Sequence, residues 1–423
     1  MLVVQKFGGS SVADVEHIQR VAKRIYSYAS RGDQVVAVVS AMGDTTDELI
    51  DLSQQITKKP SRREMDILMT AGERISMSLL AMAVTELGVK AKSFTGQQAG
   101  IFTNEEYGKA HIADVVPERI SKTLAKGQVA IVAGFQGLHK GSRDVTTLGR
   151  GGSDTTAVAL AAALKADVCE IYSDVDGVFT ADPRICPKAH KIAAVEYDEM
   201  LEMAASGAKI LALRCVEYAR RFNVKVHVRS SFSDKEGTII GKETKMDVED
   251  LEAPLITGIA HDSSESKVTI VGVPDRPGVA ARVFELMSSK DINVDMIVQN
   301  VSTQVQGYTD ISFTLPSSQG NSAIEALSAV KDQVGFNRIE LDDRVGKVSL
   351  IGVGMKTNSG VSSKFFAALR DADVNVEMIS TSEIRISVIT RANQLPAAVQ
   401  ALHTAFELDS EQEEAVVYGG TGR

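Results

Sequence analysis

The chain has few cysteines. Three occur among 423 residues, Cys169, Cys186 and Cys215, and they are odd in number and widely spaced. This usage argues against a disulfide framework or a zinc site and is typical of a reducing compartment, so we expect a cytoplasmic protein. The seven histidines are scattered without metal-ligand spacing. The sequence therefore predicts no dedicated metal site made of protein side chains.

The chain also lacks an excess of basic residues. Lysine and arginine number 46 against 55 aspartates and glutamates, which gives a net charge of −9. Nucleic-acid binding needs a basic face, so we expect no nucleic-acid partner. The longest apolar runs are too short to cross a bilayer, and no basic region followed by an apolar stretch opens the chain. We expect no membrane partner and no export.

Two common nucleotide-binding motifs are absent. The sequence contains neither G-x-x-x-x-G-K-[ST] nor G-x-G-x-x-G. The first absence excludes the common phosphate loop, and the second removes support for a nicotinamide-type dinucleotide domain. A phosphate ligand would therefore need a different kind of loop.

Strand-like and helical segments alternate over residues 1–245. Short apolar runs that favour strands occur at 2–4, 35–39, 129–133, 169–172 and 224–228. A helix of mostly alanine and leucine is expected over 155–165. The alternation predicts an α/β fold, a three-layer αβα sandwich with a mainly parallel sheet, in which ligands gather at the carboxyl ends of the strands.

The second half of the chain contains an internal repeat. The segment 267–273 (KVTIVGV) returns as 347–353 (KVSLIGV), and 291–297 (DINVDMI) returns as 373–379 (DVNVEMI). Matches of seven residues in two places indicate a duplicated structural unit. Each copy has the pattern of a βαββαβ module.

These modules are predicted at 265–343 and 344–423, after a charged linker without clear pattern at 246–264. Segments 256–259 and 415–418 are spare strand candidates. Either can complete one of the two modules, so the linker region can hold a strand shared with a module.

The segment Lys6-Phe7-Gly8-Gly9-Ser10-Ser11 lies between a strand-like run and a helical pattern that begins near Val15. Glycine lets the backbone approach an anion, and the following helix offers unpaired N–H groups and a positive dipole end. Lys6 adds a positive charge, so the segment predicts a phosphate site. The alternative is a tight turn in which Ser11 and Asp14 only cap the helix.

A second glycine cluster, Gly149-Arg150-Gly151-Gly152-Ser153-Asp154, opens the alanine-rich helix. Arg150 can hold a carboxylate or phosphate through two parallel hydrogen bonds, and Asp154 can hold neighbouring lysines by charge. Two glycine loops that each carry a cation predict one anion gripped from both sides.

Two further segments leave alternatives open. Thr70–Arg74 is predicted to begin a helix, where Glu73 either accepts from an ammonium group or is a solvated helix-start carboxylate; the residue alone favours the second. Residues 172–184 follow a strand and form either a plain hairpin or a nucleotide contact. In the second case Arg184 and Lys209 reach phosphates, and Asp174 and Asp182 face Mg²⁺.

Taken together and in order, six motifs resemble the aspartate kinase family: KFGGSS, Ser40-Ala41-Met42-Gly43, TAGER, GRGGSD, YSDVDGVFTADPR and GAKILALR. The similarity covers essentially the whole chain, is closest to the monofunctional, lysine-sensitive type, and implies an amino acid kinase fold. The repeat resembles paired ferredoxin-like ACT domains, which bind free amino acids. The resemblance implies transfer of the ATP γ-phosphate to the side-chain carboxylate of L-aspartate, with Mg²⁺, as the first step of lysine, threonine and methionine biosynthesis.

The resemblance also implies roles for individual residues. The catalytic set is Lys6, Asp154 and Lys209. The ATP-binding set is Lys6, Gly8, Gly9, Ser10, Ser40, Ser173, Asp174, Phe179, Asp182, Arg184 and Lys209. The aspartate-binding set is Thr45, Glu73, Arg150, Gly151, Gly152 and Ser153. The family often has tyrosine where this chain has Phe179, which puts a hydroxyl contact there in doubt.

For the repeat, the resemblance implies inhibition by lysine and threonine together, with effectors bound between ACT units of different subunits. The first module would use the loop Asp275, Arg276, Pro277, Gly278 and Val279, and then Asn293, Val294, Asp295 and Gln299 on the next strand. The second module would use Asn375, Val376, Thr381 and Ser382. Its loop at 354–360 lacks the Pro-Gly pair and the aspartate, so we expect the two pockets to differ in selectivity.

The implied assembly is a homo-oligomer, or a complex with a shorter regulatory subunit from an internal start for which Met246 is a candidate. Two other functions stay possible at this point. One is a related kinase acting on glutamate, acetylglutamate or a nucleoside monophosphate. The other is an amino-acid sensor with an inactive kinase domain.

Overall fold

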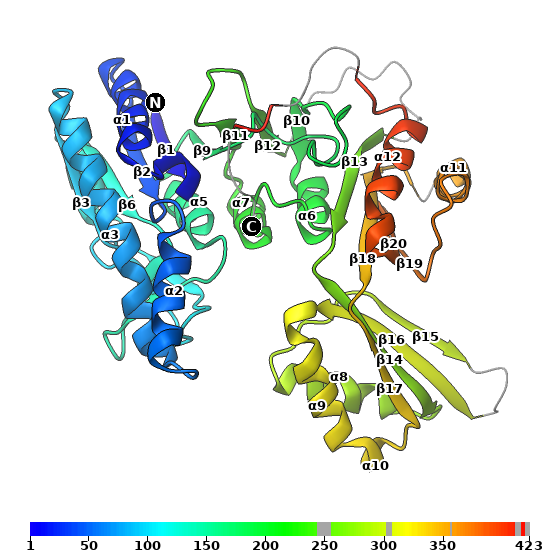
Figure 1. Ribbon diagram of the computed structural model, residues 1–423. Helices are drawn as coiled ribbons and strands as arrows, with labels where there is room; N and C mark the ends of the chain where they lie inside the picture. The colour runs from blue at the N-terminus through cyan, green and yellow to red at the C-terminus, as the bar shows by residue number, and fades with distance from the viewer. Residues whose placement is uncertain (243–254, 302–306, 356–357, 411–415, 419–423) are drawn as a thin grey trace. The chain divides into compact units, whose positions relative to one another are not determined.

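The computed structural model describes residues 1–242, 255–301, 307–355, 358–410 and 416–418. The chain divides into two compact units (Figure 1). The first comprises Met1–Ala205, Lys209–Glu249 and Glu411–Arg423, and the second comprises Ser206–Ala208 and Asp250–Ser410. The first part of the expected linker at 246–264, with Met246, lies outside the described residues.

The first unit is built on an eight-stranded sheet in the order β10-β12-β11-β9-β1-β2-β6-β3. Only the β11–β12 pair is antiparallel among these neighbours, so the predicted mainly parallel sheet is confirmed. Its strands are β1 (Leu2–Phe7), β2 (Gln34–Val39), β3 (Ala91–Phe94), β6 (Val129–Ala133), β9 (Val168–Ser173), β10 (Ala194–Glu196), β11 (Val226–Ser230) and β12 (Thr238–Gly241).

Helices cover both faces of this sheet. They are α1 (Val15–Ser30), α2 (Thr45–Ile56), α3 (Arg62–Glu86), α4 (Glu118–Leu124), α5 (Gly152–Leu164), α6 (Tyr197–Ala205) and α7 (Leu213–Phe222). Apolar side chains of α1 and α3, such as Ile25 and Leu80, pack against Val3 and Phe7 of β1. Alternate residues of a strand face opposite sides, so Val4 and Lys6 point the other way, toward α5. Figure 1 shows α3 and α5 on opposite sides of β1.

A second, smaller sheet was not predicted. It has the order β5-β4-β7-β8. Its strands are β4 (Ile101–Thr103), β5 (Ile112–Val115), β7 (Gln136–His139) and β8 (Val145–Thr147). Strands of three or four residues give too short a pattern to be recognised in the sequence. This sheet leads the chain directly into the glycine cluster that precedes α5.

One prediction about α3 is wrong. Thr70–Arg74 does not begin a helix, because α3 already begins at Arg62 and continues to Glu86. By length and composition alone this helix is apolar enough to cross a membrane. However, its residues Met77, Leu80 and Val84 are buried in the core against the sheet. It is therefore a core helix of the folded unit.

The second unit contains two four-stranded sheets, with orders β15-β16-β14-β17 and β13-β18-β20-β19. The first module runs through β14 (Glu265–Pro274), α8 (Val279–Ser289), β15 (Ile297–Val301), β16 (Tyr308–Pro316), α9 (Gly320–Ala329), α10 (Lys331–Val334) and β17 (Arg338–Asp342). The second runs through β18 (Val345–Val353), α11 (Ser359–Asp371), β19 (Met378–Thr381), β20 (Arg385–Arg391) and α12 (Leu395–Ala405). The predicted βαββαβ order is confirmed for the first module.

The second module takes its fourth strand from elsewhere in the chain. Strand β13 (Leu255–Asp262) precedes the first module in sequence but pairs antiparallel with β18. It contains the spare strand expected at 256–259. The other spare strand, 415–418, begins outside the described residues. Its residue Val417 instead forms a bridge with Val175 in the first unit.

Exchanged ion pairs connect the two modules. Lys347 of β18 is fully buried and contacts Glu265 and, at 2.6 Å from Nζ to Oδ2, Asp295. In the repeat, Lys347 corresponds to Lys267, and Asp295 corresponds to Glu377. Lys267 in turn contacts Glu377. Each module therefore contributes a lysine that forms an ion pair with a carboxylate of the other module.

Candidate functional site

The loops that follow β1, β2, β6 and β9 lie at one edge of the large sheet, because these strands are parallel neighbours. They are the loops that begin at Gly8, Ser40, Gly134 and Asp174. The carboxyl ends of parallel strands are where α/β folds bind ligands. The predicted phosphate segment, the Ser40 motif and the predicted nucleotide segment therefore share this edge.

An ion pair joins the two glycine clusters. Lys6 Nζ lies 2.6 Å from Asp154 Oδ1, and the two side chains are only 13% and 11% exposed. Lys6 is the sixth residue of the chain and Asp154 lies in the first turn of α5, so the contact fixes β1 against that helix. A cation held in this way is positioned for an anion that enters between the clusters.

The backbone around Gly9 is closely covered by the loop after β2. Gly43 N donates to Gly9 O at 3.2 Å, and a Cβ at Gly9 would lie 3.0 Å from Gly43 O. Ser40 is held in the same way, because its N–H donates to Phe7 O and its carbonyl accepts from Ser76 Oγ. Hydrogen bonds therefore hold the loops after β1 and β2 together. Thr45 begins α2 beside them and donates its hydroxyl to Met42 O.

Glu73 reaches the loop after β2 from α3. Its side chain is 3% exposed, and Oε1 accepts a hydrogen bond from Ala41 N at 3.2 Å. Among the described residues, Oε2 has no hydrogen-bond partner. Burial raises the pKa of Glu73 to about 7, against the smaller opposite effect of its backbone hydrogen bonds. The reading of Glu73 as a solvated helix-start carboxylate is therefore wrong.

Gly72 makes this approach possible. A Cβ at Gly72 would lie 2.6 Å from the Cβ of Ala41, so a larger residue would push α3 away from the loop. In TAGER, the small Gly72 thus lets α3 approach the loop, and the neighbouring Glu73 carboxylate reaches the Ala41 backbone. An unpartnered buried carboxylate oxygen at a ligand edge suits an ammonium group.

Two residues that the sequence analysis missed hold the second glycine cluster in place. Asp66 of α3 is buried and accepts from Thr147 N, Thr147 Oγ1 and Gly108 N at 2.8–3.0 Å. Arg214 of α7 donates to Leu148 O at 3.0 Å and to Ala110 O at 2.8 Å. Burial raises the pKa of Asp66 despite these hydrogen bonds. Asp66 lies in none of the six motifs, and Arg214 is the last residue of GAKILALR, from which only Lys209 was assigned a role.

The glycines of this cluster are required by the geometry. Gly151 has φ +68°, and a Cβ there would lie 2.2 Å from the Cβ of Ala212, directly before α7. Arg150 is exposed and, among the described residues, makes no hydrogen bond or ion pair. Its guanidinium is therefore free to hold an anion. Gly152 and Ser153 are buried at the start of α5.

Lys209 lies in the turn between α6 and α7, shortly before Ala212. It is exposed, and no ion pair ties it to the described residues around it. Because Gly151 packs on Ala212, the turn that carries Lys209 is anchored to the second glycine cluster.

The segment after β9 brings together most of the predicted nucleotide residues. Arg184 makes two hydrogen bonds to Asp182, from Nε to Oδ1 at 2.9 Å and from Nη2 to Oδ2 at 3.0 Å. The pKa of Arg184 lies above its ordinary value because of Asp182 first and also Asp174. Phe179 is half-buried, and its backbone forms an isolated antiparallel β-bridge with Lys191. The segment is thus an irregular loop, not the hairpin considered as its alternative.

A chain of hydroxyl groups connects this loop to the phosphate segment. Ser11 Oγ donates to Ser231 Oγ at 2.9 Å, and Ser231 Oγ donates to Ser173 O at 3.2 Å. Ser11 is therefore buried and does not cap α1, whereas Asp14 does, by accepting from His17 N. Ser10 lies with Ser11 in a short 3-10 helix, Gly9–Val12, and Gly8 directly before it is close to the Lys6 ammonium.

The predicted effector residues of the first module lie at two places. Asp275–Gly278 form the loop between β14 and α8, as expected, and Gly278 has φ +90° at the helix start next to Val279. Asn293, Val294 and Asp295 precede β15 and only Gln299 lies on it, so their predicted placement on that strand is wrong.

In the second module, Thr381 ends β19 and Ser382 follows it, while Asn375 and Val376 precede that strand. The backbone carbonyl of Asn375 accepts from Thr390 Oγ1 at 2.7 Å. These positions match those of the first module, as the repeat requires.

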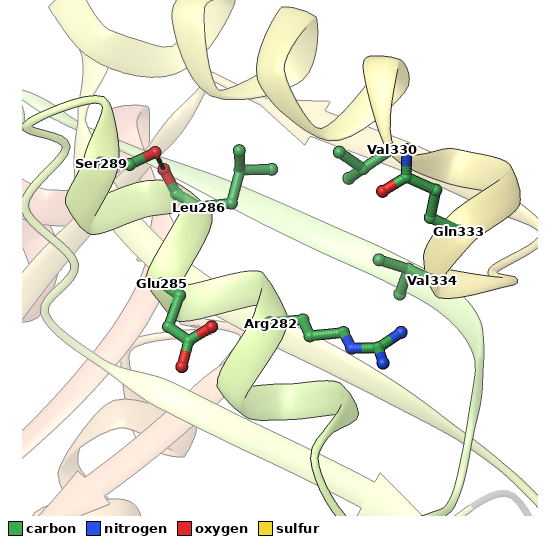
Figure 2. Close-up of a pocket in the computed structure, with 7 residues that line it drawn as sticks. All are labelled: Arg282, Glu285, Leu286, Ser289, Val330, Gln333 and Val334. Atoms are coloured by element: carbon green, nitrogen blue, oxygen red, sulfur yellow. Dashed lines mark hydrogen bonds between the residues drawn. The ribbon is translucent and has the colours of Figure 1, made fainter.

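Two cavities open beside α8 in the first module. One of about 290 Å³ is lined in part by Asn293 and Val294, next to Phe284 and Met287. The other, of about 320 Å³, lies between α8 and α10 and is lined by Arg282, Glu285, Leu286, Ser289, Val330, Gln333 and Val334 (Figure 2). Only the first includes predicted effector residues.

Comparison with known proteins agrees with this geometry. The amino acid kinase family profile matches residues 1–230, and the ACT domain profile matches residues 268–330 and 348–406. The chain is 58% identical to an aspartokinase of Mycolicibacterium smegmatis over 424 residues, covering 100% of both chains.

Two crystal structures are also similar, both of E. coli aspartokinase III. One is a complex with aspartate and ADP in the R-state, with a TM-score of 0.82 and 26% identity over 96% of this chain and 100% of that one. The other is a complex with lysine and aspartate in the T-state, with a TM-score of 0.71 and 26% identity over 95% of this chain and 99% of that one.

Proposed function

The chain belongs to the aspartokinase family and phosphorylates the side-chain carboxylate of aspartate, and on this premise we propose how its residues divide the work. The observation that carries the proposal is the Lys6–Asp154 ion pair between the two glycine clusters. Lys6, with the backbone of Gly8, Gly9 and Ser10, holds the phosphoryl group as it is transferred. Asp154 keeps Lys6 in position, and Lys209 adds a second cation.

No general base is needed for this reaction. The side-chain carboxylate of aspartate is ionised at neutral pH and attacks the γ-phosphorus of ATP directly, forming the new O–P bond as the bond to ADP breaks. The protein must therefore align two anions and neutralise the charge between them. A fixed ammonium in a partly buried site does this more strongly than one in water.

The amino acid substrate is held by its other two charged groups. Arg150, exposed and without a partner among the described residues, binds the α-carboxylate. Glu73, with one buried oxygen unpartnered, accepts from the ammonium. Thr45, Gly151, Gly152 and Ser153 line the space between them. Ser40, Ser173, Asp174, Phe179, Asp182 and Arg184 contact the nucleotide.

ATP is the phosphoryl donor of the family. Mg²⁺ fits this site only if the nucleotide supplies part of its ligands. The described residues contain no group of three or more His, Cys, Asp or Glu side chains able to hold a metal. Both oxygens of Asp182 are engaged by Arg184. We propose that Mg²⁺ is bound by nucleotide phosphate oxygens with Asp174 nearby, and that it lowers the charge on those oxygens.

The ACT modules give the enzyme its regulation. We propose that lysine and threonine bind at the Asp275–Val279 loop, the 293–299 segment and their counterparts at Asn375–Ser382, in a cytoplasmic oligomer. The E. coli aspartokinase III structure with lysine supports the effector class. An assembly containing a shorter subunit started at Met246 is part of the same proposal.

Steady-state kinetics test these assignments. The wild-type protein is assayed with aspartate, glutamate and acetylglutamate, each with and without lysine plus threonine. We expect turnover with aspartate and inhibition by the pair. Arg150→Lys should raise KM for aspartate at least tenfold, since a lysine cannot form the two parallel bonds, while KM for ATP changes little. An unchanged aspartate KM would remove Arg150 from the site, and activity unaffected by both amino acids would refute the regulatory proposal.

A further inference from the structure

A short segment near the end of the chain lies against the loop that follows β9. Val417 forms an antiparallel bridge with Val175, and Tyr418 N donates to Asp174 O at 2.9 Å. Both contacts are within the first unit. The backbone of this loop is therefore held by residues that follow α12, the last helix of the second module, although the sequence analysis had extended that module to residue 423.

The Tyr418 side chain adds two further contacts. Its hydroxyl lies 3.4 Å from Asp176 Oδ2, and its ring stacks on Phe232 at 6.1 Å between centroids and 14° between planes. Phe232 lies in the loop between β11 and β12. Tyr418 thus connects the loop after β9 with the loop after β11.

Asp176 is the centre of this connection. It is 4% exposed, accepts from Ser233 Oγ, and lies 3.5 Å from Lys235 Nζ. Its position fixes the turn at Val175–Gly177, immediately next to Asp174. A residue that holds Asp176 from a third direction limits how far this turn moves.

We propose that Tyr418 is a positioning residue for the nucleotide. Tyr418 holds the turn at Val175–Gly177 so that Asp174 and Arg184 face the bound ATP. It contacts neither the substrate nor the reacting atoms. The proposal rests on the proposed role of Asp174 and Arg184 in nucleotide binding. It adds a part of the chain outside both the kinase motifs and the ACT repeat.

The test measures nucleotide binding and kinetics in the full-length protein. Tyr418→Ala should weaken ADP binding and raise KM for ATP about three- to tenfold, while kcat and KM for aspartate stay within about twofold. Tyr418→Phe keeps the ring on Phe232 and should show a smaller effect. Tyr26→Ala, which removes another partly exposed tyrosine of the same unit, is the control and should change none of these values.

The outcomes separate the two proposals. An unchanged ADP affinity in Tyr418→Ala overturns the positioning role, whatever its effect on thermal stability. If Tyr418→Ala lowers ADP affinity and kcat and raises KM for aspartate by the same factor, the positioning role is overturned as well, because such changes indicate a general loss of structure. Asp174→Asn is measured beside it: if that variant binds ADP normally the nucleotide assignment itself fails, and if only that variant is impaired, the role of Tyr418 alone fails.

Discussion

Lys6 is one residue that carries two contributions, one to structure and one to chemistry. Its ammonium is paired with Asp154 at 2.6 Å, and both side chains are mostly shielded from water. Lys6→Ala removes the cation from the transferred phosphoryl group, and loss of one such group from a shielded site costs about a hundredfold or more in rate. We expect kcat to fall by about 10²–10³-fold with the circular dichroism spectrum unchanged.

The matched control for this variant is Lys23→Ala, an exposed lysine on α1. It should retain the wild-type kcat. Near-native turnover in Lys6→Ala would exclude Lys6 from the phosphoryl site.

Glu73 predicts a specific dependence of stability on pH. Its pKa is raised from 4.5 to about 7 by burial, so the folded state holds this proton more tightly than the unfolded state. The contribution is fully favourable below pH 4.5 and is lost as the pH rises to about 7. A shift of this size corresponds to about 3 kcal/mol. Relative to wild type, Glu73→Gln should gain about that much unfolding free energy between pH 4.5 and 8, measured by urea denaturation.

Glu86→Gln, at the exposed end of the same helix, controls for the loss of one negative charge. A constant difference between wild type and Glu73→Gln over this pH range would contradict the prediction. If Glu73 receives the substrate ammonium, KM for aspartate should also decrease as the pH rises through 7, because the ionised carboxylate is the form that binds an ammonium.

At this scale the sequence identified residues that stand in motifs and missed those that act by burial. Lys6, Arg150 and Asp154 were recognisable because glycines surround them. The burial of Glu73 was not, since it depends on α3 beginning eight residues before TAGER and on Gly72 meeting Ala41. Asp66 lies outside the motifs, and Arg214 ends the GAKILALR motif without an assigned role; both bind backbone groups of another segment, and no local pattern records such a contact.

The glycine cluster before α5 is the element on which the two halves of the site depend. Gly151 combines a positive φ of +68° with a neighbouring Cβ only 2.2 Å from where its own would be. Gly151→Ala therefore costs about 1–2 kcal/mol for the backbone conformation, and the overlap with Ala212 adds to it. We expect a lower melting temperature and at least a tenfold lower kcat/KM for aspartate.

Gly127→Ala separates these two effects. Gly127 has nearly the same φ, +65°, with nothing within 4 Å of an added Cβ. It should lose only the conformational part of the stability and keep its kcat/KM. Equal activity in the two variants would show that the contact with Ala212 does not position the cluster.

Element by element, the predicted strands were found where continuous apolar runs mark them, and helix α5 where alanine and leucine do. Errors arose where the boundary depended on tertiary contacts. The start of α3 lies in a polar stretch around Arg62, and the small sheet of β4, β5, β7 and β8 has strands too short to show a period. The segment at 293–295 was assigned to a strand because it lies in the repeated run 291–297, whereas strand β15 begins only at Ile297.

At the scale of the whole molecule, the ion pairs that Lys347 and Lys267 form with the other module indicate that the two ACT modules stabilise each other. Lys347 is fully buried; burial lowers its pKa, but Glu265 and Asp295 outweigh this and raise the pKa above its ordinary value. Removing one partner of a buried pair leaves an uncompensated charge and costs about 3–5 kcal/mol. Lys347→Met should therefore lower the melting temperature of the full-length protein markedly.

Lys331→Met, at an exposed position on α10, is the matched control. The double variant Lys347→Met/Glu265→Gln should recover part of the lost stability, because it also removes the unpaired charge. No recovery would show that the loss comes from packing rather than from the buried carboxylate.

Strand β13 has a consequence for the order of events during synthesis. It leaves the ribosome before the first ACT module, yet its partner β18 is made only after that module is finished. Until then, its backbone groups have no partner in the sheet they will join, and such an edge invites pairing with other chains. The first module is thus the earliest part of the second unit able to close its own sheet, and slow translation between Leu255 and Val353 should favour aggregation of nascent chains through β13.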